Sequence, residues 1–158
     1  MISRPVKRAA DSALNNQLYI IFPHDLNPNG TVFGGTVMAQ ADKVAGLVAM
    51  RHSGQICVTA FVESFRFLAP ARRGEVLVFY ASLNRVWHSS MEVGVKVFSD
   101  NCVTGERRQV VSAYYTFVPI DENHRPARAN YGLLPETEEE KRRYQEAEKR
   151  RLRRHSSL

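Results

Sequence analysis

One long apolar segment, residues 35–50, most restricts the folds that this chain can adopt. From residue 37 to residue 50 its polar side chains are Gln40, Asp42 and Lys43. A helix that is apolar on nearly all sides is a buried helix, so the segment predicts a helix at the centre of the fold. A carboxylate on such a helix costs free energy unless it is paired or takes part in chemistry. Asp42 is therefore either a satisfied structural acid or a working one.

Segments of β-type sequence surround this predicted helix. They cover residues 18–22, 56–68, 76–86, 91–98 and 109–118. The links between the last four segments are short, which favours antiparallel pairing. One helix among antiparallel strands predicts an α+β fold, in which an antiparallel sheet wraps around one long buried helix.

The chain divides into three sections. A length of 158 residues suits a single domain, which we place at residues 16–130. Residues 1–15 are expected to form a flexible N-terminal arm. Residues 131–158 are expected to form a charged C-terminal helix or tail, because acids come first and bases last, which complements the helix dipole. Few apolar residues occur there, so this section is predicted to be solvated and not part of the core.

Composition narrows the class of protein. No apolar run reaches the roughly 18 residues needed to cross a bilayer, and no apolar h-region of a secretory signal follows the N-terminus. Cys57 and Cys102 have neither metal-type spacing nor a disulfide framework. A reducing, cytoplasmic location is therefore expected, with a mitochondrial leader as the less favoured alternative. The net charge of +6 favours an anionic ligand or surface.

The spacing of a few polar and glycine residues resembles a known family. Asn27 is followed by Gly35 after eight positions and by Asp42 after seven more, and residues 67–70 (Phe-Leu-x-Pro) and 73–75 (Arg-Gly-Glu) continue the pattern. This set resembles the acyl-CoA thioesterases (acyl-CoA hydrolases) of the hot-dog fold over about residues 17–130. The resemblance implies that fold, hydrolysis of acyl-CoA to a fatty acid and coenzyme A, and a role in fatty acid metabolism.

The residues themselves suit thioester hydrolysis. Backbone N–H groups of Gly34, Gly35 and Thr36, at a helix N-terminus, can stabilise a developing oxyanion. Asp42 would act as general base or nucleophile. By resemblance, Asn27 orients the carbonyl or the water, and Asn27 and Asp42 come from different subunits of a homodimer or of a hexamer built as a trimer of dimers. The resemblance makes Gly35 a catalytic position alongside these two residues.

Each assignment has a simpler rival. Asp42 can be a buried acid paired with a cation, Asn27 before Pro28 can be a turn former, and Gly34-Gly35 can merely permit close packing. Thr59 is equally a packing residue or a substrate contact.

Coenzyme A carries several phosphate charges, for which arginine and lysine are natural ligands. By resemblance, the nucleotide lies near a set of basic and hydroxyl residues: Arg73, Ser89, Ser90, Arg125 and Arg128. No metal-ligand spacing appears, so no metal and no separate cofactor are expected, since coenzyme A is part of substrate and product.

Two other functions remain open. The segment Asp25-x-Asn27-Pro28 is similar to a motif of hot-dog enoyl-CoA hydratases, but Gly30 stands where that motif needs histidine. A non-catalytic acyl-CoA-binding protein is the second alternative. Residues 136–158 contain eight Lys or Arg and six Glu, a mixture that argues against a nucleic-acid-binding arm.

Overall fold

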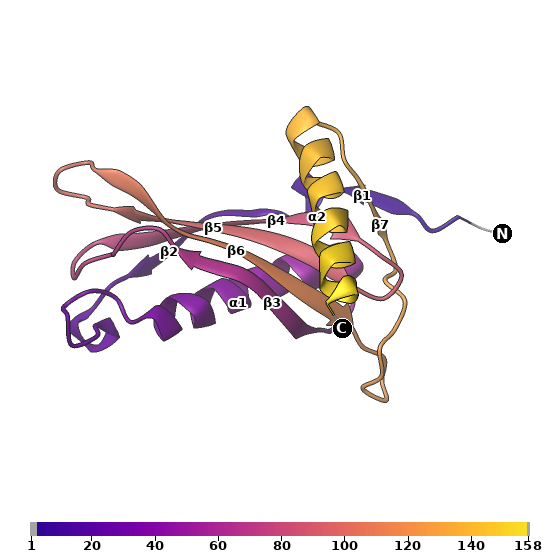
Figure 1. Cartoon of the computed structure of the whole chain (residues 1–158), viewed down its shortest axis with the longest axis horizontal. Coiled ribbons are helices and arrows are strands. Elements are labelled where there is room, and N and C mark those ends of the chain that lie inside the picture. Colours follow the sequence, from indigo (N-terminus) through magenta and orange to yellow (C-terminus); the bar gives the residue numbers. More distant parts are fainter. Residues whose placement is uncertain (1–2, 158) are drawn as a thin grey trace.

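A computed structural model describes residues 3–157 as one curved sheet with a helix on each face (Figure 1). The five strands lie in the order β2-β4-β5-β6-β3, and every neighbouring pair is antiparallel. A separate two-stranded sheet joins β1 to β7. The elements are β1 (Val6–Arg8), η1 (Ala9–Asp11), β2 (Leu14–Ile20), η2 (Pro23–Asp25), α1 (Gly34–Ser53), β3 (Cys57–Phe67), β4 (Val76–Val86), β5 (Met91–Asp100), β6 (Arg107–Pro119), β7 (Gly132–Leu134) and α2 (Glu138–Ser156).

The core lies between the sheet and α1. On β5 the side chains of Met91, Val93 and Val97 are fully buried and belong to the cluster that packs against α1. Because successive side chains of a strand point to opposite faces, the intervening side chains, such as those of Glu92 and Lys96, lie on the other face of the sheet. The predicted α+β architecture and the four long antiparallel strands are confirmed.

Helix α1 is buried along one face only. Small residues, such as Ala41 and Ala45, are fully buried and allow the helix to lie close to the sheet, whereas Met38 and Leu47 are 40% and 48% exposed. The prediction of a helix buried on all sides is therefore wrong for the single chain. Gly54, with φ of 67°, ends the helix and donates to the carbonyl of Met50, as a left-handed C-terminal glycine does.

The N-terminal segment is ordered where the structure describes it. Strand β1 pairs in parallel with β7, and Ala9 and Ser12 are buried. Lys7 donates from Nζ to the carbonyl of His52, near the C-terminus of α1. A flexible arm was expected at residues 1–15; within residues 3–15 the chain forms β1, η1 and the start of β2, because long-range pairing holds a segment that has little local signal. Residues 1–2 lie outside the described part.

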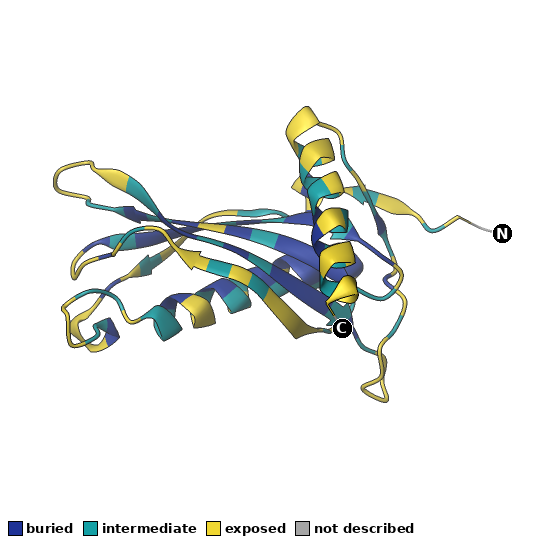
Figure 2. Cartoon of the chain, viewed as in Figure 1, coloured by how far each residue is buried: buried dark blue, intermediate teal, exposed yellow. Residues whose placement is uncertain are grey.

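Helix α2 lies across the face of the sheet opposite α1 (Figure 1). Thr137 caps its first turn by accepting from the N–H of Glu140, whose side chain accepts in return. Ala147 and Arg150 are buried, while most of the remaining helix surface is exposed (Figure 2). The helix was expected, but its description as solvated holds for one face only.

Candidate active site

A tight loop between β2 and α1 carries Asn27. Asp25, only 3% exposed, accepts a hydrogen bond from the hydroxyl of Tyr19 at 2.7 Å and another from the N–H of Phe22 at 2.9 Å. Burial alone would raise the pKa of Asp25, but these two hydrogen bonds outweigh it and the pKa falls below its ordinary value. The N–H of Phe33 donates to the Asp25 carbonyl at 2.7 Å and closes the loop.

The Asn27 side chain is engaged within its own loop. Its Oδ1 accepts from the N–H of Asn29 at 2.9 Å and from the N–H of Thr31 at 3.3 Å, and its Nδ2 donates to Thr31 Oγ1 at 2.9 Å. These bonds are those of an Asx-type turn. The turn-forming role is therefore present, and it fixes the direction in which the amide points.

A groove of about 480 Å³ runs beside this loop. It brings Asn27 together with Gly34 and with Phe67 and Leu68 of the sequence pattern noted above. The remaining lining is largely apolar and consists of Thr31, Val32, Val37, Ala69, Pro70, Ala71, Val110 and Val111. The groove thus places a polar amide at the side of an apolar channel.

The N-terminus of α1 opens beside the groove. Among the described residues no side chain caps this terminus, and the N–H of Thr36 donates back to the Phe33 carbonyl at 3.0 Å. A Cβ on Gly34 would lie 3.0 Å from the Phe67 ring, and a Cβ on Gly35 would collide with the Phe33 ring. Both glycines therefore have a packing role. N–H groups at a helix N-terminus that no side chain caps are available to donate to an anion.

Asp42 lies in the third turn of α1, next to the edge strand β3. Its Oδ1 accepts a hydrogen bond of 2.6 Å from the hydroxyl of Thr59, an exposed residue. Within residues 3–157, Asp42 takes part in no ion pair. Burial, followed by the charge of Asp42, raises the pKa of the neighbouring Tyr115. The carboxylate is thus half-buried and oriented by a hydroxyl, without a cation.

One chain does not bring Asn27 and Asp42 together. Asn27 lies at the groove beside Gly34, and eight helical steps, about 12 Å, separate Gly34 from Asp42 along α1. Thr59 is the predicted site residue that contacts Asp42 directly.

The predicted nucleotide ligands fall at two ends of α1. Arg73 is exposed in a turn next to the Asn27 loop, where Thr31 bridges to Arg72. Arg128 lies at the other end, because Gln55, just after α1, donates to its carbonyl at 3.1 Å. The turn with Ser89 and Ser90 lies at that second end too, since the neighbouring His88 carbonyl accepts from the N–H of residue 129. Arg125 is exposed on the loop that follows β6.

The sequence reasoning missed the residues that support the Asn27 loop. Glu75, 4% exposed, pairs with Arg108 at 2.8 Å and accepts from the N–H of Arg72 at 3.1 Å. Burial opposes ionisation here too, yet the hydrogen bonds and the Arg108 charge lower the pKa of Glu75. The Arg-Gly-Glu motif at 73–75 was the available signal. Glu63 of β3 pairs with Arg154 of α2 at 3.3 Å.

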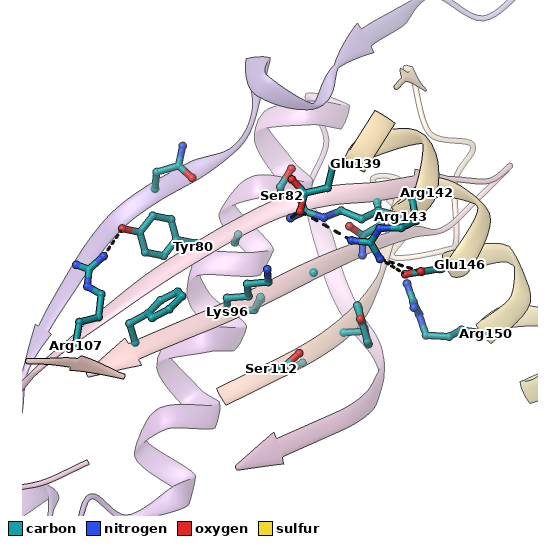
Figure 3. Close-up of a pocket in the computed structure, with 18 residues that line it drawn as sticks. Tyr80, Ser82, Lys96, Arg107, Ser112, Glu139, Arg142, Arg143, Glu146 and Arg150 are labelled. Carbon is teal, nitrogen blue, oxygen red and sulfur yellow. Dashed lines mark hydrogen bonds and ion pairs between the residues drawn. The ribbon is translucent and has the colours of Figure 1, made fainter. Parts of the chain in front are cut away.

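A second groove, of about 450 Å³, lies between α2 and the outer face of the sheet (Figure 3). It is rich in arginine, but its charges are mostly satisfied: Arg142 pairs with Glu146 at 2.8 Å and Arg107 with Asp100 at 2.6 Å. Arg150 of α2, which also lines this groove, pairs with Glu92 of β5 at 2.6 Å and so attaches the helix to the sheet.

The described residues contain neither a cluster of metal-binding side chains nor a helix of membrane-spanning type. No group of three or more His, Cys, Asp or Glu side chains in that part of the chain is placed to hold a metal ion. No helix within residues 3–157 is long and apolar enough to cross a membrane.

Comparison with known proteins defines the class. A model of the thioesterase superfamily matches residues 29–106. YkhA of Bacillus subtilis, an uncharacterized acyl-CoA thioester hydrolase, is 38% identical over 120 residues, which cover 76% of this chain and 69% of YkhA. The rat cytosolic acyl coenzyme A thioester hydrolase is 32% identical over 96% of this chain, but the chain spans only 40% of that longer protein.

Solved structures of acyl-CoA thioesterases resemble this chain over nearly its whole length. A hexameric acyl-CoA thioesterase in its apo form has a TM-score of 0.92 and 35% identity, with 97% of each chain covered. The acyl-CoA hydrolase of Staphylococcus aureus, in complex with butyryl coenzyme A and coenzyme A, has a TM-score of 0.85 and 35% identity over 97% of this chain and 94% of that one. The fold is therefore a hot-dog fold of the thioesterase superfamily. Within it, the chain belongs to the acyl-CoA thioester hydrolases, and the predicted enzyme class is confirmed.

Proposed function

We propose that this chain hydrolyses acyl-CoA thioesters, with Asp42 as general base or nucleophile and Asn27 orienting the carbonyl or the water. The proposal rests mainly on the environment of the Asp42 carboxylate. A structural acid would be buried against a cation, whereas Asp42 is partly accessible, has no ion-pair partner among the described residues and is held by Thr59 at 2.6 Å. Structures have been solved of S. aureus acyl-CoA hydrolase variants in which an aspartate, an asparagine or a threonine is replaced by alanine, and Asp42, Asn27 and Thr59 are the same three residue types.

Asp42 can bring about the hydrolysis by either of two routes. As a base, Asp42 takes a proton from water while the water oxygen bonds to the thioester carbonyl carbon. As a nucleophile, Asp42 bonds to that carbon itself and water later cleaves the acyl anhydride. In both routes the C–S bond breaks, the thiolate of coenzyme A leaves and takes up a proton, and a fatty acid is released.

The negative charge that develops on the carbonyl oxygen needs donors that are already in place. The uncapped N–H groups of Gly34 and Gly35 supply them, and the positive end of the α1 dipole adds to their effect. Gly35 is therefore proposed as a catalytic backbone position, and Thr36 as a neighbouring substrate contact. The acyl chain occupies the apolar groove beside Asn27.

A second subunit completes the site. Asn27 and Asp42 are separated within one chain, and β3 is an edge strand with Val58, Phe61 and Phe67 exposed by 41% to 53%. An exposed apolar edge of this size is covered by a partner in most soluble proteins. A homodimer, or a hexamer of the kind named for one solved relative, brings Asn27 of one subunit to Asp42 of the other.

Several finer expectations remain part of the proposal. Coenzyme A is part of the substrate, no metal or further cofactor takes part, and nucleic acid is not a partner. The setting is fatty acid metabolism in the cytoplasm. Arg73, Ser89, Ser90, Arg125 and Arg128 are proposed contacts of the coenzyme A portion. Enoyl-CoA hydration is disfavoured, because Gly30 cannot supply the missing imidazole; acyl-CoA binding without turnover is the alternative that an inactive wild type would favour.

Single variants test the catalytic roles. Asp42→Ala should lower kcat by about 10²–10⁴-fold, the range that one acid–base group contributes. Binding of acyl-CoA and the melting temperature should stay near those of the wild type. A loss of about 3–5 kcal/mol in unfolding free energy would instead identify Asp42 as a structural, paired acid. Thiol release from acyl-CoAs of graded chain length, with and without a chelator, measures the activity.

Mixing two inactive variants tests the shared site. Asp42→Ala and Asn27→Ala subunits, after verified exchange, form heterodimers with one intact and one doubly altered site. Random mixing gives half heterodimers, so about a quarter of wild-type activity should return. No recovery would place both residues in one chain or remove one of them from the mechanism.

A further inference from the structure

The turn between β4 and β5, Trp87–Ser90, is contacted by segments that are far apart in the sequence. Trp87 donates from Nε1 to Glu148 Oε2 of α2 at 2.6 Å. Arg4, in the N-terminal segment, donates to the Trp87 carbonyl at 2.8 Å, and the N–H of Ala129 donates to the carbonyl of His88 at 2.9 Å. Both terminal segments of the chain therefore meet at this turn.

Glu148 is the residue of α2 that contacts both Trp87 and Arg85. Its Oε2 also lies 3.0 Å from Arg85 Nε, although that N–H is not aligned for a hydrogen bond, so the attraction there is that of two opposite charges. Arg85 in turn donates to the Tyr144 carbonyl at 3.2 Å and lies 4.0 Å from the centre of the Tyr144 ring. One carboxylate thus satisfies the indole N–H and neutralises the adjacent guanidinium, which fixes the orientation of Trp87.

A cavity of about 520 Å³ opens beside the turn. Its charged lining is basic: Arg4, Arg128 and, when protonated, His88, with Trp87 and Tyr144 among its walls. Neither Arg4 nor Arg128 forms an ion pair within residues 3–157. Burial and then the positive charge of Arg128 lower the pKa of Arg4, so these two cations repel one another. An anion bound between them would relieve that repulsion.

We propose that Glu148 is a positioning residue for substrate binding: through Trp87 it fixes the turn, so that Arg4 and Arg128 receive a phosphate group of the coenzyme A nucleotide. The inference rests on the proposed hydrolysis of acyl-CoA. It extends that proposal by adding Arg4 to the ligands and by giving the charged C-terminal helix a function in substrate affinity.

The test compares three variants on two substrates. Glu148→Ala removes the contact, Glu148→Gln keeps an oxygen that can accept from Trp87, and Glu146→Ala is the control. Glu146 is on the same helix, with a side chain 37% exposed against 33% for Glu148, and it pairs with Arg142 away from the turn. The substrates are an acyl-CoA and the same acyl group on N-acetylcysteamine, which lacks the nucleotide.

Glu148→Ala should raise KM for acyl-CoA about fivefold or more, as expected when a charge-assisted contact is misplaced, and leave kcat within about twofold. Kinetics on the N-acetylcysteamine thioester should not change. Glu148→Gln should recover most of the affinity, and Glu146→Ala should match the wild type.

Trp87 gives a second, direct readout because it is the only tryptophan of the chain. Its fluorescence should change on titration with coenzyme A. In Glu148→Ala the half-saturating concentration should rise by the same factor as KM, while far-ultraviolet circular dichroism stays that of the wild type.

The outcomes separate the two proposals. Equal losses on both substrates, or a Glu148→Ala enzyme that behaves like Glu146→Ala, would overturn the positioning role and leave the hydrolase intact. If the wild type neither hydrolysed acyl-CoA nor bound coenzyme A, the proposed function would be overturned, and the role proposed for Glu148 would be overturned too.

Discussion

The two long helices of this protein are buried differently from what their compositions suggest. α1 is apolar around most of its circumference, yet a single chain leaves Met38 and Leu47 substantially exposed. α2 is among the most charged segments of the chain, yet it buries Ala147 and Arg150 against the sheet. The comparison shows that the composition of a helix does not by itself say how much of its surface is buried. The burial of each helix depends on the sheet, or on a second subunit, that packs against it.

The contact of α2 depends on one buried ion pair. Arg150 lies 2.6 Å from Glu92 Oε1, and Asn84 donates to the same carboxylate at 2.9 Å. The Arg150 guanidinium is also 3.7 Å from the centre of the Tyr114 ring. Gly94 makes room for this arrangement, since a Cβ there would lie 2.9 Å from Asn84 Nδ2.

Removing Arg150 should have the largest effect on stability. Arg150→Met leaves Glu92, 1% exposed, without its cation and should cost about 3–5 kcal/mol of unfolding free energy. Denaturant unfolding measures it, with Arg142→Met as the exposed control, expected to cost at most about 1 kcal/mol. A double variant, Glu92→Leu with Arg150→Met, should recover much of the loss. If Arg150→Met and Arg142→Met lowered the unfolding free energy by the same small amount, the Arg150 face of α2 would be solvated and not buried.

The open face of α1 gives the second prediction. If a partner subunit covers it, Met38→Asp should weaken the dimer at least about tenfold, or about 1.4 kcal/mol, because a charge enters an apolar contact. Val103→Asp is the control, since Val103 is 95% exposed at a hairpin. Sedimentation at several protein concentrations distinguishes them; an unchanged dimer, or a wild type that is an active monomer, would remove the need for a partner.

The third prediction concerns acid stability at the end of α1. His52 is fully buried, and its Nε2 lies 3.0 Å from the Gly132 carbonyl. Burial lowers the pKa of His52; the hydrogen bond to Gly132 and the charge of Asp11 oppose this shift, while the charges of Lys7 and Arg4 add to it. Below about pH 6.5 His52 is protonated in the unfolded chain but not in the folded chain. The free energy of unfolding therefore falls as the pH falls, by at most about 1.4 kcal/mol per pH unit.

His52→Asn should therefore flatten the dependence of unfolding free energy on pH between about 6.5 and 5, whereas exposed His124→Asn should not. Parallel curves for the wild type and both variants would refute the assignment. The lowered pKa values of Asp25 and Glu75 act in a separate window, because their contribution is lost only near and below about pH 4.5.

The sequence by itself determined most of the long elements of the fold, and its resemblance to a family named the candidate site residues. Alternation along residues 91–98, the apolar run before Gly54 and the spacing of Asn27, Gly35 and Asp42 are local signals, because they depend on the periodicity of a strand or a helix and on neighbours a few positions away. They were enough for the fold class and for four of the five main strands nearly to the residue, whereas the contact between Thr59 and Asp42 came only from the structure.

Only the tertiary structure decided the rest. Glu92 and Arg150 are 58 positions apart, and Arg4 reaches a turn 83 positions away, so no local pattern shows which face of α2 is buried or that the N-terminal segment is ordered. Long-range contacts depend on which groups the sheet places opposite one another, and a sequence read along its length does not contain that information.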